Sequence, residues 1–218
     1  MDQSLTMLMF SAVALGFVHT ISGPDHYLPF VAMSKTRNWS KAKTIWVVTI
    51  CGLGHVLGSV VIGLFGIGAG LLVGKLEFFE GIRGSLASWL LFSAGVVYTV
   101  WAIIHRIRKP NHSHNHFNEK TSAKKTMTFW VLFTIFVFGP CEPLIPILMY
   151  PAAEMNVYAI IIVSLLFAIT TIGTMLVSTL LMLKGISFIR LHKLESYQHI
   201  LAGLTLLISG AGIIFLGL

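Results

Sequence analysis

The feature that most constrains this chain is a series of six apolar segments, each long enough to supply the roughly 20 residues that a membrane-spanning helix requires. We place the segments at about residues 5–31, 44–73, 85–104, 128–150, 157–183 and 197–218. Hydrophobic residues make up 56% of the sequence and charged residues only 11%, which excludes a soluble domain with a single membrane anchor. The pattern predicts an all-α polytopic membrane protein with six transmembrane helices, formed as a single membrane domain over residues 1–218.

Lys and Arg are distributed unevenly among the connections between these segments. The connections after the first, third and fifth segments contain four, six and three of them, whereas the other side has only Lys75 and Arg83. Because basic loops remain on the cytoplasmic side, we expect a multi-pass protein of the cell's inner (plasma) membrane with both termini outside. The loop at about residues 105–127 then faces the cytoplasm. The formal net charge of +7 therefore does not call for a nucleic-acid partner.

The two halves of the chain carry matching motifs. A Gly-Pro pair opens the polar stretch at residues 23–29 in the first segment, and another opens residues 139–146 in the fourth. Three segments per half is an odd number, so the second half must be inverted relative to the first. We predict a 3+3 inverted repeat, with repeat 1 at about residues 5–104 and repeat 2 at about 128–218. Secondary transporters often have this architecture, with a site near the midplane between the repeats.

Prolines interrupt the first and the fourth segment. Pro24 and Pro29 in the first, like Pro140, Pro143 and Pro146 in the fourth, have no backbone N–H and leave carbonyls one turn earlier without an intrahelical donor. A broken helix inside a membrane is tolerated only where protein or a polar cavity satisfies these groups. We therefore predict Pro-broken helices 1 and 4. The alternative is a merely kinked helix whose histidines bond to neighbouring carbonyls.

Side chains that can bind a metal ion lie at the depth of these breaks. They are His19, Asp25, His26, His55, Cys141 and Glu142. Ionisable groups are costly inside a membrane and usually face a pathway or a bound ion. Imidazole, carboxylate and thiolate ligands suit a divalent transition metal such as nickel or cobalt, with zinc and copper as further candidates. We predict one metal site from these six residues, with the ion as cargo, no permanently bound cofactor and no enzymatic activity.

The repeat also predicts how these side chains meet. It sets Asp25 opposite Cys141 and His26 opposite Glu142 across the pseudo-two-fold axis. Two of the residues have simpler alternatives. His55 lies next to a glycine and could bond across a helix interface, while Cys141 could be a ligand, a redox-active thiol or a small packing residue.

The cytoplasmic loop contains a second group of histidines. His112, His114 and His116 alternate with Ser and Asn, a composition typical of metal-binding tracts. The alternative is a solvated, disordered loop, and both descriptions can hold together. We predict an accessory metal loop that collects ions on the cytoplasmic face. Such a loop favours export over import, although importers can carry similar loops.

With these motifs the chain resembles the nickel/cobalt transporters. The residues concerned are His19-x5-Asp25-His26 in the first segment and Gly-x-Gly-His55 in the second. The pattern is most similar to the six-span branch of the lysine-exporter superfamily that includes urease-accessory-type and sulfite-exporter-like proteins. The resemblance implies transport of divalent transition metals through His19, Asp25, His26 and His55. The nickel permeases usually have four residues, not five, between the first His and the Asp, so nickel selectivity is the part of the resemblance that this departure affects.

We therefore predict a secondary transporter of divalent transition-metal ions in the lipid bilayer. The main alternative is a transmembrane thiol-disulfide electron carrier of the DsbD/CcdA type, which Gly-Pro-Cys141 also resembles. Thiol exchange requires two cysteines that can meet, whereas the residue equivalent to Cys141 is Asp25 and Cys51 lies in another segment. A metal-sensing membrane protein without transport is a third possibility. The sequence leaves open the direction and energy coupling of transport, and whether the protein forms a homo-oligomer.

Overall fold

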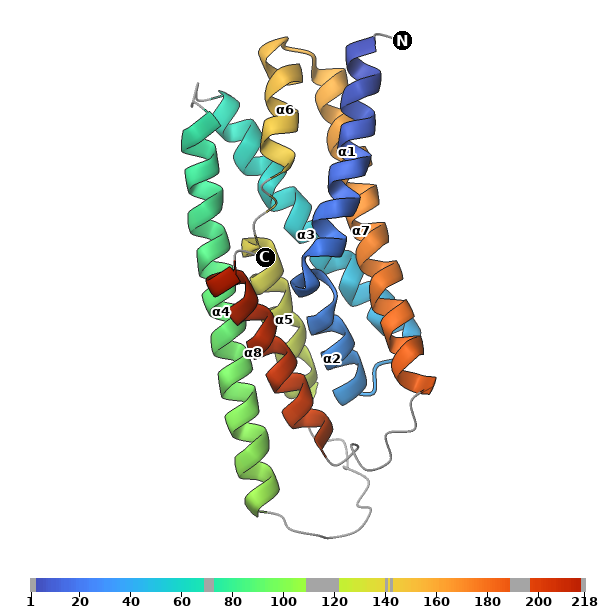
Figure 1. The fold of residues 1–218 in the computed structure, drawn as a ribbon, viewed down its shortest axis with the longest axis vertical. Coiled ribbons are helices and arrows are strands. Elements are labelled where there is room, and N and C mark those ends of the chain that lie inside the picture. The colour runs from blue at the N-terminus through green and yellow to red at the C-terminus, as the bar shows by residue number, and fades with distance from the viewer. Residues whose placement is uncertain are drawn as a thin grey trace.

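The computed structural model describes residues 3–68, 73–108, 122–139, 141, 143–188 and 197–216. Within these residues the chain is all-helical, with 93% helix and no strands. The elements are α1 (Gln3–Ser22), η1 (Pro24–His26), α2 (Leu28–Thr36), α3 (Lys41–Gly68), α4 (Val73–Arg108), α5 (Ser122–Phe138), α6 (Leu144–Ala153), α7 (Val157–Phe188) and α8 (Gln198–Leu216). Most of these helices extend along one long axis, with α3 inclined across the bundle (Figure 1).

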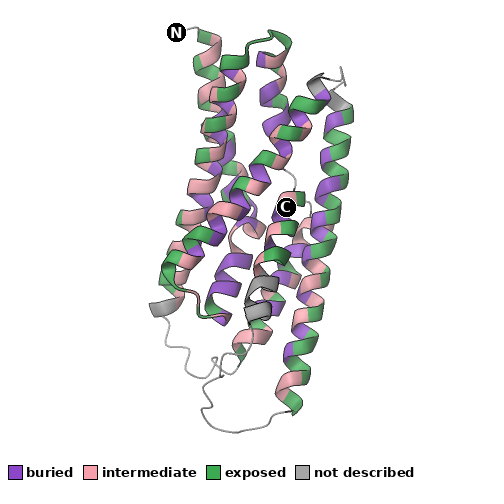
Figure 2. Cartoon of the chain, turned by 180° about the vertical axis from the view of Figure 1, so that it is seen from behind, coloured by how far each residue is buried: buried purple, intermediate pink, exposed green. Residues whose placement is uncertain are grey.

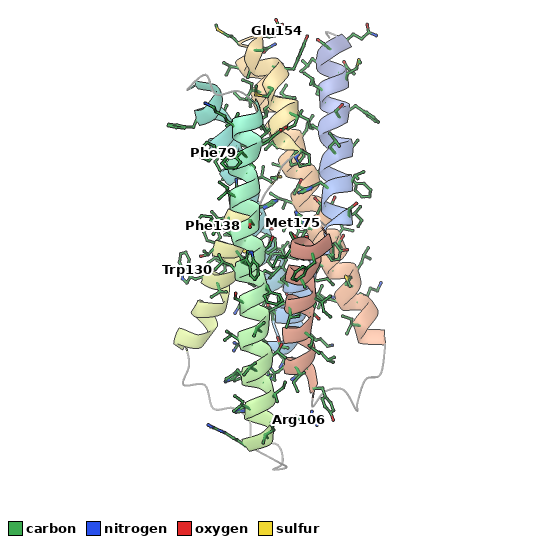
Figure 3. The ribbon with its side chains drawn as sticks, turned by 60° about the vertical axis from the view of Figure 1, so that its left-hand side comes forward. Phe79, Arg106, Trp130, Phe138, Glu154 and Met175 are labelled. Atoms are coloured by element: carbon green, nitrogen blue, oxygen red, sulfur yellow. The ribbon has the colours of Figure 1, made fainter. Side chains whose placement is uncertain are left out.

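The surface of this bundle is apolar along most of its length. Five described helices, α1, α3, α4, α7 and α8, are long and apolar enough to cross a membrane, and α5 and α6 are shorter apolar helices. Exposed residues follow the outer faces of the helices (Figure 2), and the side chains of Phe79 and Trp130 project from the bundle (Figure 3). Phe10 and Phe65 are 75% and 78% exposed. Soluble monomers rarely expose contiguous apolar surface on this scale, so the protein is membrane-embedded.

The first and fourth apolar segments are both broken. In the first, α1 ends at Ser22, Gly23 is extended, and the 3-10 turn η1 separates it from α2. In the fourth, α5 ends at Phe138 and α6 begins at Leu144. The two apolar segments in which we predicted breaks are thus each divided into two helices. Each break exposes backbone groups in the middle of the bundle, where only protein or a cavity can satisfy them.

The third apolar segment is longer than the sequence suggested. We expected a helix at about residues 85–104, but α4 contains 36 residues. Its early turns contain Glu80 and Arg83, which are buried and form an ion pair one turn apart. Because each charge balances the other, the helix can bury both where a single unpaired charge would be costly. The expectation that Arg83 lies in an external loop is therefore wrong.

Helices α4 and α8 pack backbone to backbone and run in opposite directions (Figure 1). Glycines make this approach possible. A Cβ atom at Gly203 would lie 2.8 Å from the backbone nitrogen of Thr99, and one at Gly210 would lie 2.5 Å from that of Phe92. Any larger residue at either position would force the two helices apart.

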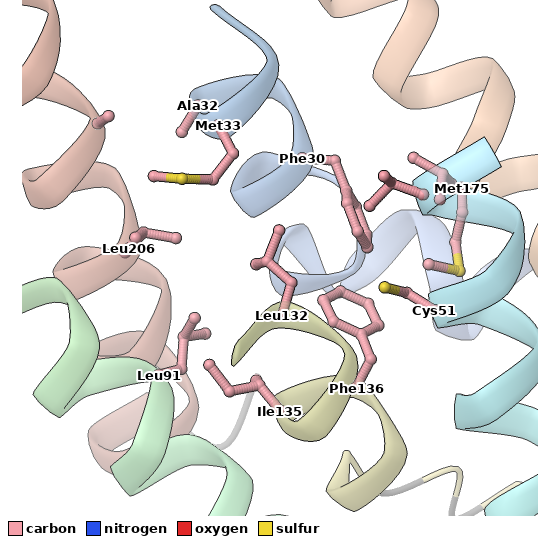
Figure 4. Packing of buried hydrophobic residues seen from close by; sticks show 13 residues of the cluster. Phe30, Ala32, Met33, Cys51, Leu91, Leu132, Ile135, Phe136, Met175 and Leu206 are labelled. Carbon is pink, nitrogen blue, oxygen red and sulfur yellow. The ribbon is translucent and has the colours of Figure 1, made fainter. Parts of the chain in front are cut away.

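Two apolar clusters fill the bundle. One surrounds Phe30 and Phe136, whose ring centroids are 4.5 Å apart, and it includes Cys51 and Met175 (Figure 4). We call it the Phe30 cluster. The other, which we call the Cys141 cluster, packs residues of α1, α3, α6 and α7 around Cys141. The two cysteines are thus buried in different clusters, and both are free thiols.

Candidate metal centre

Three histidines from two apolar segments converge at the first break. His19 lies in the last turn of α1, His26 in η1, and His55 near the middle of α3. One ligand atom from each of the three lies within 4.8 Å of those of the other two. The ring centroids of His26 are 4.7 Å from His19 and 5.1 Å from His55. The break is what brings them together, because η1 turns the chain so that His26 lies beside His19.

Hydrogen bonds define the tautomers of two of these rings. His26 Nδ1 lies 3.0 Å from the carbonyl oxygen of Gly23, and His55 Nδ1 lies 3.2 Å from that of Phe136. A carbonyl oxygen can only accept, so in each neutral ring Nδ1 carries the hydrogen and Nε2 keeps its lone pair. The Nε2 atoms of His19, His26 and His55 are all buried without a hydrogen-bond partner. An unsatisfied buried polar atom costs about 1–3 kcal/mol, which a bound cation would relieve.

Asp25 contacts the Nδ1 side of His26 and is not one of the three grouped ligand residues. Its Oδ1 lies 3.2 Å from His26 Nδ1, on the side of the ring away from Nε2, and its side chain is 24% exposed. A carboxylate in this position orients a ligand imidazole and makes it a better donor to a metal ion. The structure therefore gives Asp25 contact with His26 instead of a place in the group of three ligand atoms.

Gly23 is required by the geometry of this break. A Cβ atom there would lie 2.6 Å from His26 Nδ1 and 2.8 Å from Asp25 Oδ1. Both distances are shorter than any normal contact, so a side chain would displace the imidazole or the carboxylate. The Gly-Pro pair thus does more than end α1, since it also leaves room for the groups that follow it.

The histidines open onto a cavity of about 310 Å³. Its walls include apolar side chains such as Leu91, Phe136 and Ile213, and its polar lining comes from His19, Ser22, Asp25, His26, His55 and Ser88. A water molecule occupies about 30 Å³ of liquid volume, so the cavity can hold an ion with several waters. The site therefore combines fixed nitrogen donors with room for exchangeable ligands.

The remaining predicted ligands are not part of this group. Cys141 is fully buried in the Cys141 cluster, and among the described residues only the three histidines form a group with ligand spacing. The thiol of Cys141 packs among apolar side chains, and its expected approach to Asp25 stays a prediction. Glu142 and the loop residues His112, His114 and His116 lie outside the described residues.

The second break contains a polar network that was not predicted from the sequence. Arg83 donates to Glu80, to Ser59 Oγ at 3.0 Å and to the carbonyl oxygen of Gly139 at 2.7 Å. Glu80 in turn accepts from the backbone N–H of Cys141 at 3.2 Å. The spacing of Glu80 and Arg83, one helical turn apart at the edge of an apolar segment, is the pattern that could have revealed the pair.

Comparison with known proteins adds no relative. No family model matches the chain, and no curated protein or solved structure matches it either. The geometry of the three histidines, together with the sequence motifs that contain them, is therefore the basis for a functional assignment.

Proposed function

We propose that this protein is a secondary transporter of divalent transition-metal ions, with nickel and cobalt as the leading candidates for cargo. The observation that carries the proposal is the group formed by His19, His26 and His55, whose Nε2 atoms are buried without a hydrogen-bond partner and which each offer one ligand atom within 4.8 Å of the others. Ionisable groups inside a membrane protein are costly and are retained where they serve a pathway or a bound ion.

The chemistry of the donors favours transition metals over magnesium or calcium. Imidazole nitrogen suits nickel, cobalt, zinc and copper, whereas magnesium and calcium bind to sets of oxygen ligands. Three protein donors also leave coordination positions for water, unlike a closed structural site with four. The adjacent carboxylate of Asp25 offsets part of the charge of a divalent cation. Such a site can bind its ion and release it again.

The packing of the helices supports six spans and an inverted repeat. In this proposal α1 with α2 forms the first span, α5 with α6 forms the fourth, and α3, α4, α7 and α8 are the others. The contacts are symmetric under exchange of the two halves: α1 packs on α7 as α3 packs on α5 and α6, and α4 packs on its counterpart α8. Each span also runs opposite to its counterpart (Figure 1).

The distribution of charge supports the orientation with both termini outside. Lys35, Lys41 and Arg106 belong to the ends of α2, α3 and α4 that share one end of the bundle in Figure 1. Figure 3 places Arg106 near this end and Glu154 at the other. By the positive-inside rule the basic end is cytoplasmic. We propose export as the direction, because the histidine loop at about residues 105–127 would then collect ions on the side from which they leave.

The thiol-disulfide carrier is less compatible with the structure. Exchange requires one thiolate to attack another sulfur directly, yet Cys51 and Cys141 are fully buried in separate apolar clusters. Neither Cys51 nor Cys141 lines the cavity next to the three histidines. We therefore propose that both cysteines are packing residues.

Nickel titration of the purified protein tests the transport site. We expect His26→Ala to lose tight binding, because it removes the central ligand, while a variant with His112, His114 and His116 all replaced by Ala keeps it. Uptake of nickel into proteoliposomes should follow the same order. If the loop variant lost tight binding and His26→Ala kept it, the first break would be a structural kink and the proposal would fail.

A further inference from the structure

A buried ion pair holds the second break, and the proposed transport site makes no direct use of it. Glu80 is fully buried and Arg83 is 7% exposed, both on α4. A buried ion pair is a poor device for stability alone, since apolar residues of similar volume often stabilise a protein as well or better. Its contacts therefore need a separate explanation.

The pair satisfies two backbone groups within the second break. Arg83 Nη2 donates to the carbonyl oxygen of Gly139 at 2.7 Å, just after the end of α5. Glu80 Oε2 accepts from the N–H of Cys141 at 3.2 Å, two residues further on. Together the two side chains link the backbone of Gly139 and of Cys141 to α4.

The same pair also fastens α3. Ser59 Oγ lies 3.0 Å from Arg83 Nη1 and 3.2 Å from Glu80 Oε2, and Arg83 Nη2 lies 3.4 Å from the carbonyl oxygen of His55. Gly58 leaves space for the guanidinium group, since a Cβ atom there would lie 2.9 Å from Arg83 Nη2. One ion pair thus connects α4, α3 and the end of α5.

These contacts lead to the ring of His55. Its Nδ1 donates to the carbonyl oxygen of Phe136, which also accepts from the N–H of Gly139 at 3.1 Å. The position of that oxygen depends on the last turn of α5, and Arg83 holds that turn through Gly139. We propose that the Glu80–Arg83 ion pair is a positioning element that fixes the end of α5, so that the Phe136 carbonyl keeps His55 Nε2 turned toward the metal site. The inference rests on the proposed function for its purpose and on the hydrogen bonds for its geometry.

Two variants test the positioning role in purified full-length protein. Arg83→Lys keeps a charge beside Glu80, but an ammonium group cannot reach several acceptors in the fixed fork of a guanidinium group. The double variant Glu80→Met/Arg83→Met removes both charges, leaves no unpaired ion and is expected to fold. Loss of an orienting partner typically costs a ligand site about 10–100-fold in metal affinity, and we expect a loss of this size for nickel in both variants.

A metal-free measurement separates this inference from the transport proposal. In protein labelled with ¹⁵N-histidine, the ring signal of His55, identified by its loss in His55→Gln, should show a hydrogen on Nδ1 in the wild type. We expect that signal to shift or split in both ion-pair variants. Thr99→Val is the matched control, because Thr99 is buried on the same helix, its hydroxyl donates to the Gly95 carbonyl of α4 itself, and it does not line the cavity.

The outcomes distinguish the two ideas. If the folded double-Met variant retains the wild-type His55 signal and nickel affinity, the ion pair serves only the fold and the inference is overturned. If the wild type binds no nickel at the histidines, the transport proposal fails, and the His55 signal in the metal-free variants still decides whether the pair positions the ring.

Discussion

The two breaks begin with the same Gly-Pro pair, yet the structure uses them differently. At the first break, the carbonyl oxygen of Gly23 accepts a hydrogen bond from the ring of His26, and imidazole side chains line a cavity. At the second, the carbonyl oxygen of Gly139 accepts a hydrogen bond from Arg83, and the thiol of Cys141 packs among apolar side chains. One break supplies the candidate ligands, while the other is held by side chains from a neighbouring helix.

The difference shows that one structural problem has two solutions here. Any broken helix in a membrane must satisfy its freed backbone groups. Side chains within the break can do so, and the same side chains can then face a ligand. Alternatively, an ion pair brought in by another helix can do so, and the break then becomes a fixed support. Matching motifs in the two halves of the chain therefore do not imply matching roles.

The largest change in nickel affinity is expected when a methyl group is added at the glycine of each break. In Gly23→Ala the new Cβ would lie 2.6 Å from His26 Nδ1, and nickel affinity should fall about 100-fold because the ring must move. In Gly139→Ala the nearest atom, His55 Nδ1, is 3.0 Å away, and a smaller loss is expected. Isothermal titration of both variants measures the ratio. Equal losses would mean that the two breaks contribute alike.

A smaller effect is expected from the charge of Asp25. Asp25→Asn keeps an oxygen that can accept from His26 Nδ1 but removes the negative charge, so nickel affinity should fall about tenfold. Tyr27→Phe is the control from the same break, since its hydroxyl contacts only the carbonyl of Ile21 among the bonds described and lies at 3.4 Å. An unchanged affinity in Asp25→Asn would show that the carboxylate neither orients the ring nor offsets the charge of the ion.

The smallest effect on binding is expected at the second break. Cys141→Ala removes one buried sulfur from an apolar cluster and should lower the free energy of unfolding by about 1 kcal/mol. Nickel affinity should stay at the wild-type value, because the thiol is outside the group of ligand atoms. Thermal unfolding and nickel titration of the same preparation check both statements. A tenfold loss of affinity would make Cys141 a ligand and abolish the contrast between the breaks.

Much of the first break was predictable because its causes are local. Pro24 removes an N–H wherever it stands, and polar residues at membrane depth have few places to go. His19, Asp25, His26 and His55 were accordingly singled out together, and the structure brings one ligand atom of each of the three histidines within 4.8 Å of the others. The six spans and the inverted repeat stay predictions that the packing supports.

The second break was less predictable because its conformation depends on a distant helix. Nothing near Gly139 in the sequence indicates that Arg83, 56 residues earlier, donates to its carbonyl. Arg83 itself was counted as a loop residue, because a charge at the edge of an apolar segment usually marks its end. Whether a buried charge is tolerated depends on its partners in three dimensions, which a count of residues along the chain does not contain.

His26 lies inside the 3-10 turn η1, so the conformation of this turn sets the distance between His26 and His19. In a continuous α-helix, seven residues would separate His19 from His26 by about 10.5 Å along the axis, at about 1.5 Å per residue. The ring centroids are 4.7 Å apart only because the helix is unwound between them. Rewinding these few residues would therefore pull the two ligands apart while shifting α1 relative to α2. If the histidines bind an ion, its release and the conformational change of the helix would then occur in a single step.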